Sequence, residues 1–147
     1  MAPFQTPRTS SMKPPTSSAP QIAPRRVLLL DDDRFMLDVL SEMLGMLNAS
    51  GPFDIHAEID ARRALALLPR HAPELLICDL AMPDMDGIEF LQAAAIQGYS
   101  GRVILVSAME DGVRNAATEL ARALGLQVAG AFRKPLGIEQ LRLAVQC

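Results

Sequence analysis

The sequence predicts an α/β fold, a five-stranded parallel sheet with helices packed on both faces. Short apolar runs alternate five times with helical patterns after residue 25, which is the order of elements in parallel α/β domains. Three of the runs are apolar throughout, as strands covered on both faces must be. No internal repeat or second domain is evident, so residues 25–147 are expected to form one domain.

Apolar runs place the five strands. They are Val27–Leu30, Phe53–Ile59, Leu75–Cys78, Arg102–Val106 and Leu126–Phe132. The first helix carries leucines three or four residues apart and is expected to end at Gly51-Pro52. Asp60 is expected to cap a second helix that stops before Pro69, because the residue before a proline avoids the helical conformation.

The other three helices follow the last three strands. The third is expected over Gly87–Gln97, and the fourth over about 109–124 with Gly125 as its stop. The last is marked by Ile138, Leu141 and Val145.

Residues 1–24 differ from the rest of the chain. They hold six of the eleven prolines, seven Ser or Thr and no acidic residue, and such a segment cannot bury enough apolar surface to offset its ordering entropy. We expect a disordered tail. The remaining residues carry a net charge of −5 and no basic stripe, which argues against direct binding of nucleic acid.

The composition also bears on the compartment. No apolar run approaches the roughly 18 residues of a membrane span, and the amino terminus lacks the apolar core of a secretory signal. Cys78 and Cys147 give neither a disulfide framework nor a metal-binding spacing. We expect a cytoplasmic protein without membrane insertion, in which Cys78 is a small buried residue.

Chemically active side chains follow four of the strands. Asp31-Asp32-Asp33 follows the first strand, Asp79 the third, Ser107 the fourth and Lys134 the fifth. The carboxyl ends of parallel strands lie at one edge of a sheet, so these side chains should lie together. This is the edge at which α/β sheets bind ligands. Clustered carboxylates repel and need a cation, and Mg²⁺ prefers oxygen ligands. A hydroxyl and an ammonium beside them would complete a trap for a phosphoryl group, and a carboxylate can itself be the nucleophile.

These residues resemble the receiver domain of two-component response regulators. The resemblance covers residues 25–147 and implies a flavodoxin-like fold with strand order 2-1-3-4-5. It rests on Asp31-Asp32, Asp79 with Met82-Pro83 and Asp86-Gly87, Ser107-Ala108 and Lys134-Pro135.

The resemblance also implies roles. Asp79 would accept a phosphoryl group from a histidine of a sensor histidine kinase or a histidine phosphotransfer protein. Ser107 would bond the phosphoryl oxygen, and Lys134, followed by a bond to Pro135 that is usually cis in the family, would pair with it. The Mg²⁺ ligands would be Asp31, Asp32, Asp79 and the backbone carbonyl of Ala81. The chain would not be an enzyme beyond its own phosphorylation and slow dephosphorylation.

No output domain follows the last helix in this sequence. We therefore expect a stand-alone regulator that signals by a phosphorylation-controlled protein contact or by onward transfer in a phosphorelay. In the family the usual contact face is made by the fourth helix, fifth strand and fifth helix, and a homodimer through this face is a further expectation.

The chain departs from the family at two places. Receivers usually carry Tyr or Phe three residues before the strand-end lysine, where this chain has Ala131. Phe132 comes one residue later, which in a strand turns the side chain to the other face. We expect phosphorylation to be read mainly through Ser107 and the following loop. Ala81 and Met109 occupy positions that influence the hydrolytic water, and neither can orient it, so slow dephosphorylation is expected.

Other interpretations use the same features. Asp33 is expected to cap the first helix, and Asp84 and Asp86 to be solvated turn residues. A phosphorylation-independent scaffold would keep the receiver fold without its chemistry. A phosphohydrolase of the haloacid dehalogenase type also has Asp-x-Asp after its first strand, but that leaves Asp79 and its Met-Pro loop unexplained.

Overall fold

The computed structural model describes residues 24–47, 51–83 and 85–146. Within these ranges five parallel strands form one sheet in the order β2-β1-β3-β4-β5, as predicted. The strands are β1 (Arg25–Leu30), β2 (Phe53–Glu58), β3 (Leu75–Asp79), β4 (Arg102–Ser107) and β5 (Gln127–Arg133). The helices are α1 (Arg34–Met46), α2 (Ala61–His71), α3 (Gly87–Ile96), α4 (Asp111–Ala123) and α5 (Ile138–Gln146).

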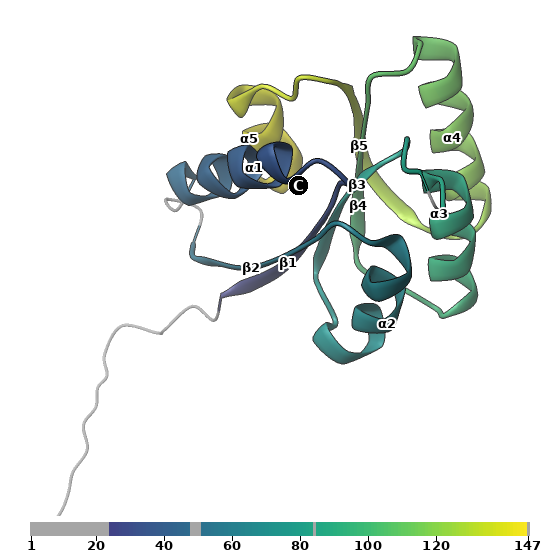
Figure 1. The fold of residues 1–147 in the computed structure, drawn as a ribbon, viewed down its shortest axis with the longest axis horizontal. Helices are drawn as coiled ribbons and strands as arrows, with labels where there is room; N and C mark the ends of the chain where they lie inside the picture. Colours follow the sequence, from purple (N-terminus) through teal and green to yellow (C-terminus); the bar gives the residue numbers. More distant parts are fainter. Residues whose placement is uncertain (1–23, 48–50, 84, 147) are drawn as a thin grey trace, which may run out of the picture.

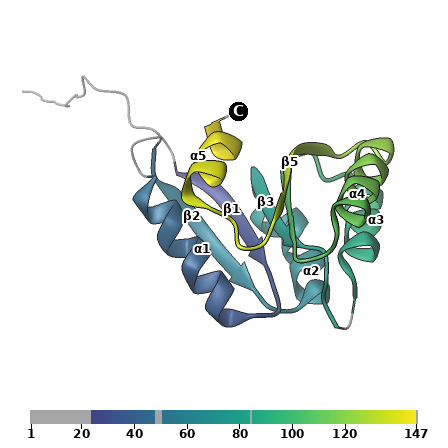
Figure 2. The ribbon, with the colours of Figure 1, turned by 90° about the horizontal axis from the view of Figure 1, so that it is seen from above.

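The helices cover both faces of the sheet. α1 and α5 lie on one face, and α2, α3 and α4 lie on the other (Figures 1 and 2). Leu28 and Leu30 of β1 belong to the core beneath α2–α4, whereas Val27 and Leu29 belong to the core beneath α1 and α5. Because neighbouring residues of a strand point to opposite faces, one apolar run supplies both cores.

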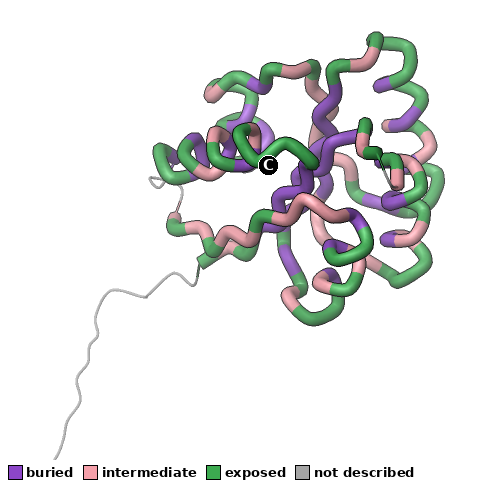
Figure 3. The backbone as a smooth tube through the Cα atoms, viewed as in Figure 1, coloured by how far each residue is buried: buried purple, intermediate pink, exposed green. Residues whose placement is uncertain are grey.

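Burial is deepest in the central strands. Every residue of β3 is buried, whereas the edge strands β2 and β5 are half-buried or exposed (Figure 3). A central strand is covered by helices on its faces and by strands on both sides, while an edge strand has one open side. The apolar runs of β1, β3 and β4 are therefore continuous, and those of the edge strands are interrupted.

Three predicted helix boundaries are confirmed. The carboxylates of Asp33 and Asp60 cap α1 and α2 by accepting hydrogen bonds from backbone N–H groups of the first turns. Gly125 follows α4 with a φ of 93°, and its N–H and that of Leu126 bond back to carbonyls of the last turn. This is the Schellman arrangement, which favours glycine because it needs a positive φ.

The prediction that Asp86 is only a solvated turn residue is wrong. Its carboxylate accepts a hydrogen bond from the Glu89 N–H at 2.8 Å, and the Glu89 side chain accepts one from the Asp86 N–H. This reciprocal pair is a capping box, which satisfies two N–H groups at the start of α3. Asp84, predicted in the same way, lies outside the described residues.

Two other boundaries differ from the prediction. α2 continues through Pro69 to His71. A proline removes one helical hydrogen bond, and here it lies in the last turn, where the Arg26 Nε donates to the carbonyls of His71 and Ala72. α1 ends at Met46, before Gly51. The predicted tail lies outside the described residues except for Pro24, and no helix within them is long and apolar enough to cross a membrane.

The end of α2 gives a test of the backbone. Ala72 has φ 49° and ψ 57°, the left-handed conformation that costs an L-residue about 1–2 kcal/mol. Ala72→Gly is therefore expected to raise the free energy of unfolding by about 0.5–1 kcal/mol, measured by urea denaturation. Ala66→Gly, at an exposed position inside the same helix, is the control and should lower it by about 1 kcal/mol. Equal effects of the two changes would contradict this account.

Candidate functional site

Three carboxylates meet at the carboxyl edge of the sheet. Asp31 follows β1 and is 2% exposed, Asp79 ends β3 and is 4% exposed, and Asp32 is exposed. One oxygen from each carboxylate lies within 4.8 Å of the others. This donor set fits a hard cation such as Mg²⁺, because it offers only oxygens and its exposed member leaves room for the waters that Mg²⁺ retains.

Lys134 joins the two buried carboxylates. Its ammonium donates to Asp31 Oδ2 at 2.9 Å and to Asp79 Oδ2 at 3.1 Å. The Lys134 N–H donates to the Ser107 carbonyl at 2.9 Å, so the loop after β5 is tied to the end of β4. The Lys134-Pro135 peptide is cis, as the resemblance implied. Side chains from opposite ends of the sequence therefore meet at this edge.

Opposing effects act on the pKa values of Asp79 and Lys134. Burial raises the pKa of Asp79, the Ala81 N–H opposes this, Asp31 adds to it, and Lys134 opposes it, with a net rise. Burial lowers the pKa of Lys134, but the two carboxylates outweigh it and the net shift is upward. Lys134 therefore stays charged, and Asp79 is a more basic carboxylate than an exposed one.

The loop after Asp79 holds this carboxylate in place. The Ala81 N–H donates to Asp79 Oδ1 at 3.0 Å, and the Gly87 N–H closes the loop on the Leu80 carbonyl at 2.8 Å. A Cβ at Gly87 would lie 2.5 Å from the Leu80 Cα, so only glycine fits this close approach. The contact of Ala81 is thus through its N–H, and the metal-binding role of its carbonyl stays a prediction.

Ser107 is buried at the end of β4 and is linked to the loop that follows. Its Oγ accepts a hydrogen bond from the Met109 N–H at 2.9 Å, and the Met109 carbonyl accepts one from Arg114 Nη1 at 2.8 Å. The sequence reasoning missed Arg114. The signal was present, because Arg114 lies three and seven residues before Ala117 and Ala121 on the buried face of α4.

The two sides of β5 are occupied as the sequence predicted. Ala131 packs against the core beneath α2–α4, and Phe132 packs against the core beneath α1 and α5. The position that carries an aromatic ring in most receivers therefore holds a methyl group on the α4 side. Asp33 caps α1, as predicted, by accepting a hydrogen bond from the Phe35 N–H. Cys78 is buried as predicted, and burial raises the pKa of its thiol.

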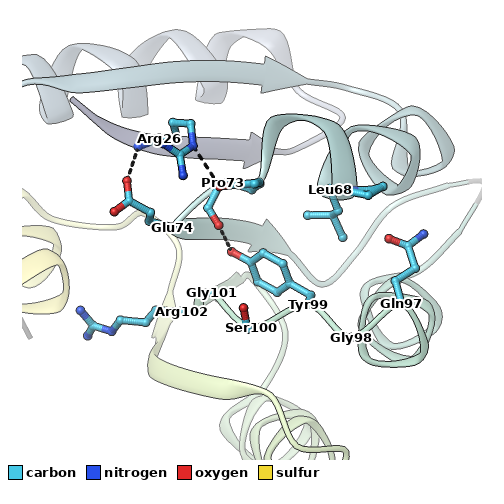
Figure 4. Close-up of a pocket in the computed structure, with 12 residues that line it drawn as sticks. Arg26, Leu68, Pro73, Glu74, Gln97, Gly98, Tyr99, Ser100, Gly101 and Arg102 are labelled. Atoms are coloured by element: carbon cyan, nitrogen blue, oxygen red, sulfur yellow. Dashed lines mark hydrogen bonds between the residues drawn. The ribbon is translucent and has the colours of Figure 1, made fainter. Parts of the chain in front are cut away.

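A pocket of about 470 Å³ lies at the opposite, amino-terminal edge of the sheet (Figure 4). Tyr99 forms one wall, and its hydroxyl donates to the Pro73 carbonyl at 3.0 Å. Arg26 donates to carbonyls at the end of α2, and Arg102 donates to the Ala144 carbonyl. Since these polar groups bond to the protein itself, this pocket lacks the convergent chemistry of the acidic edge.

Comparisons with known proteins agree with this geometry. The family model "Response regulator receiver domain" matches residues 27–146. The cyclic di-GMP phosphodiesterase RocR of Pseudomonas aeruginosa is 33% identical over 117 residues, which are 78% of this chain and 29% of RocR, so the chain spans under a third of that protein. The chemotaxis protein CheY of Bacillus subtilis is 32% identical over 85 residues, 57% of this chain and 68% of CheY.

A solved structure gives the same answer. The crystal structure of a response regulator from Colwellia psychrerythraea is 30% identical and superposes with a TM-score of 0.70 over 85% of this chain and 100% of that one. The chain therefore belongs to the response regulator receiver domain family of two-component systems, with the flavodoxin-like fold.

Proposed function

We propose that this domain accepts a phosphoryl group on Asp79 from a phosphohistidine of a sensor histidine kinase or histidine phosphotransfer protein, with Mg²⁺ bound. The observation that carries the proposal is the Lys134 ammonium, which lies within hydrogen-bond distance of Asp31 and Asp79 beside a third carboxylate. Such a cluster provides a carboxylate nucleophile, an ammonium and carboxylate ligands for a metal ion, which are the groups that stabilise a phosphoryl group during transfer.

The transfer needs little movement of the acceptor. An oxygen of Asp79 forms a bond to phosphorus while the bond from phosphorus to the donor nitrogen breaks, and the imidazole leaves with the electron pair. The Ala81 N–H and the Lys134 ammonium orient the carboxylate before the donor arrives. Lys134 and the Ser107 hydroxyl then bind the phosphoryl oxygens.

Asp31, Asp32, Asp79 and the Ala81 carbonyl would hold the metal. Bound Mg²⁺ would supply positive charge to the phosphoryl oxygens as charge develops on them. Asp31 is already oriented by the Asp33 N–H, which donates to its Oδ1 at 2.9 Å. Its other oxygen accepts a hydrogen bond from Lys134, so both oxygens of Asp31 are held in place.

Phosphorylation must also change a surface that another protein can recognise. Converting an ionised carboxylate to an aspartyl-phosphate replaces one negative charge with about two, and this added charge can bias a neighbouring surface. We propose that the signal leaves by protein contact or onward phosphotransfer, in the cytoplasm, with the α4-β5-α5 face as a contact or homodimer surface. Action of residues 25–147 without an attached output domain remains a prediction from the sequence.

Phosphoryl uptake is the primary test. After incubation with acetyl phosphate and Mg²⁺, intact mass spectrometry is expected to show one added phosphoryl group on the wild type. Asp79→Ala and a chelator should each abolish the uptake, because they remove the nucleophile and the metal. Asp54→Ala, which removes an exposed carboxylate on β2, is the matched control and should not change it. Uptake by Asp79→Ala equal to that of wild type would refute the assignment.

The metal site has a stability signature. Because the folded pKa of Asp79 is raised, its favourable contribution exists at low pH and is lost as the pH rises through that pKa. Burial of the Asp79 carboxyl group therefore opposes folding at neutral pH, so Asp79→Asn should raise the Tm by a few degrees without metal. Mg²⁺ should raise the Tm of wild type and of Asp54→Asn, but hardly that of Asp79→Asn. Equal responses to Mg²⁺ would count against Asp79 as a ligand.

The phosphoryl lifetime can be shortened by design. Ala81 is exposed and Met109 is half-buried, and neither side chain can hydrogen-bond the attacking water strongly. The double change Ala81→Asn and Met109→Glu is expected to speed loss of the phosphoryl group, followed by mass after removal of the donor. Ala123→Asn, at the exposed end of α4, is the control. An unchanged half-life in the double variant would show that these positions do not control the water.

A further inference from the structure

Arg114 occupies an unusual place for an arginine. It lies near the start of α4, is 9% exposed, and shares the buried face of the helix with Ala117 and Ala121. Arginine is almost never buried without partners. A cation near a helix N-terminus is also unfavourable, because the helix dipole is positive there. A buried cation at the positive end of the helix dipole departs from a local preference, and such departures are expected at functional or strained positions.

The partners of Arg114 explain how it is tolerated. Its Nη1 donates to the Met109 carbonyl at 2.8 Å, and its Nη2 bonds Asp111 Oδ1. The N-cap residue of α4, Glu110, makes no side-chain capping bond. The contact that joins the β4–α4 loop to α4 is therefore the Arg114 guanidinium, which bonds the Met109 carbonyl just before the helix and Asp111 in its first turn.

Met109 connects this arginine to the acidic edge. Its N–H bonds Ser107 Oγ and its carbonyl bonds Arg114, so the backbone of one residue is held on both sides. Ser107 is the hydroxyl expected to bind the phosphoryl oxygen. A displacement of Ser107 Oγ toward that oxygen changes the position of Met109, and through it the bond to Arg114 and the first turn of α4.

The contact between β5 and α4 at position 131 involves only a small side chain in this chain. Position 131, on the side of β5 that faces α4, holds only a methyl group, and the ring of Phe132 packs in the opposite core. α4 lies against β5 on this side of the sheet (Figures 1 and 2). The aromatic ring that receivers usually carry at this position of β5 is absent, whereas the polar connection from Ser107 to α4 is present.

We propose that Arg114 is a positioning residue that couples the Ser107 hydroxyl to α4, so that phosphorylation of Asp79 is reported by the first turns of this helix. The proposal rests on the function proposed above. Arg114 does not touch the acceptor, and its removal leaves Asp79, Lys134 and the metal ligands in place. Phosphoryl uptake and its report in α4 are therefore separable.

The test compares amide spectra of the full chain before and after phosphorylation with acetyl phosphate and Mg²⁺. In wild type, the signals of residues 107–109 and 111–123 should shift. Arg114→Met keeps the long apolar stem and should still take up one phosphoryl group by mass. Its shifts should persist at 107–109 and be largely lost at 111–123. Arg122→Ala, which removes an exposed arginine from the other end of α4, should behave as wild type.

Further variants separate coupling from packing. Arg114→Lys retains a cation that can donate to a carbonyl and should recover part of the α4 shifts. If only the apolar stem of Arg114 mattered, the Lys and Met variants would show the same α4 shifts. If Arg114→Met does not fold, as judged by circular dichroism, Asp111→Asn carries the test. The Asp111 side chain is 73% exposed, so its change spares the core and should weaken the same shifts.

Three results would overturn the coupling. One is a full set of α4 shifts in Arg114→Met, or in Asp111→Asn where that variant carries the test. Another is a phosphorylated wild type whose signals at 111–123 do not move. The third, no phosphoryl uptake by wild type from acetyl phosphate or from a partner kinase, would overturn the proposed function as well. The mass measurement on wild type distinguishes this last failure from the first two.

Discussion

The ammonium of Lys134 is the interaction on which the acidic edge depends. Two buried carboxylates, Asp31 and Asp79, would repel each other without a cation between them, and burial alone already raises the pKa of Asp79. The ammonium reaches both, because β1 and β3 are neighbours in the strand order and β4 alone separates β3 from β5. The topology therefore brings together charges that lie 103 and 55 residues apart in sequence.

The buried parts of β1 and β3 hold the acidic edge in place. The apolar residues of β1 and β3 are buried up to the last position before Asp31 and Asp79. Their burial stabilises the domain by roughly 25 cal/mol for each Å² of apolar surface removed from water. A site with desolvated carboxyl groups opposes folding, and the two cores offset it. The close approach of Gly87 to Leu80 then sets the path of the chain out of the site.

The sequence predicted the features that follow from strand position. Asp79 and Lys134 were found because parallel strands end at one edge, and Phe132 was placed on the far face because strands alternate. Features that depend on tertiary contacts were missed. Pro69 stays helical in the turn where Arg26 of β1 bonds the carbonyls of His71 and Ala72, and no sequence pattern near the proline reveals this contact with a strand. Arg114 was overlooked although its spacing places it among buried alanines.

The two halves of the edge differ in how they are held. On the acidic side, charged contacts fix Asp79 between Lys134 and the Ala81 N–H. On the Ser107 side, the hydroxyl and the loop are connected through the backbone of Met109, whose N–H bonds Ser107 Oγ and whose carbonyl bonds Arg114. The neutral bond to Ser107 contributes about 1 kcal/mol net. A new charge at Asp79 can exchange such bonds more readily than it can displace an ion pair. We therefore expect movement to be easiest toward α4, the helix whose first turn is tied to that loop.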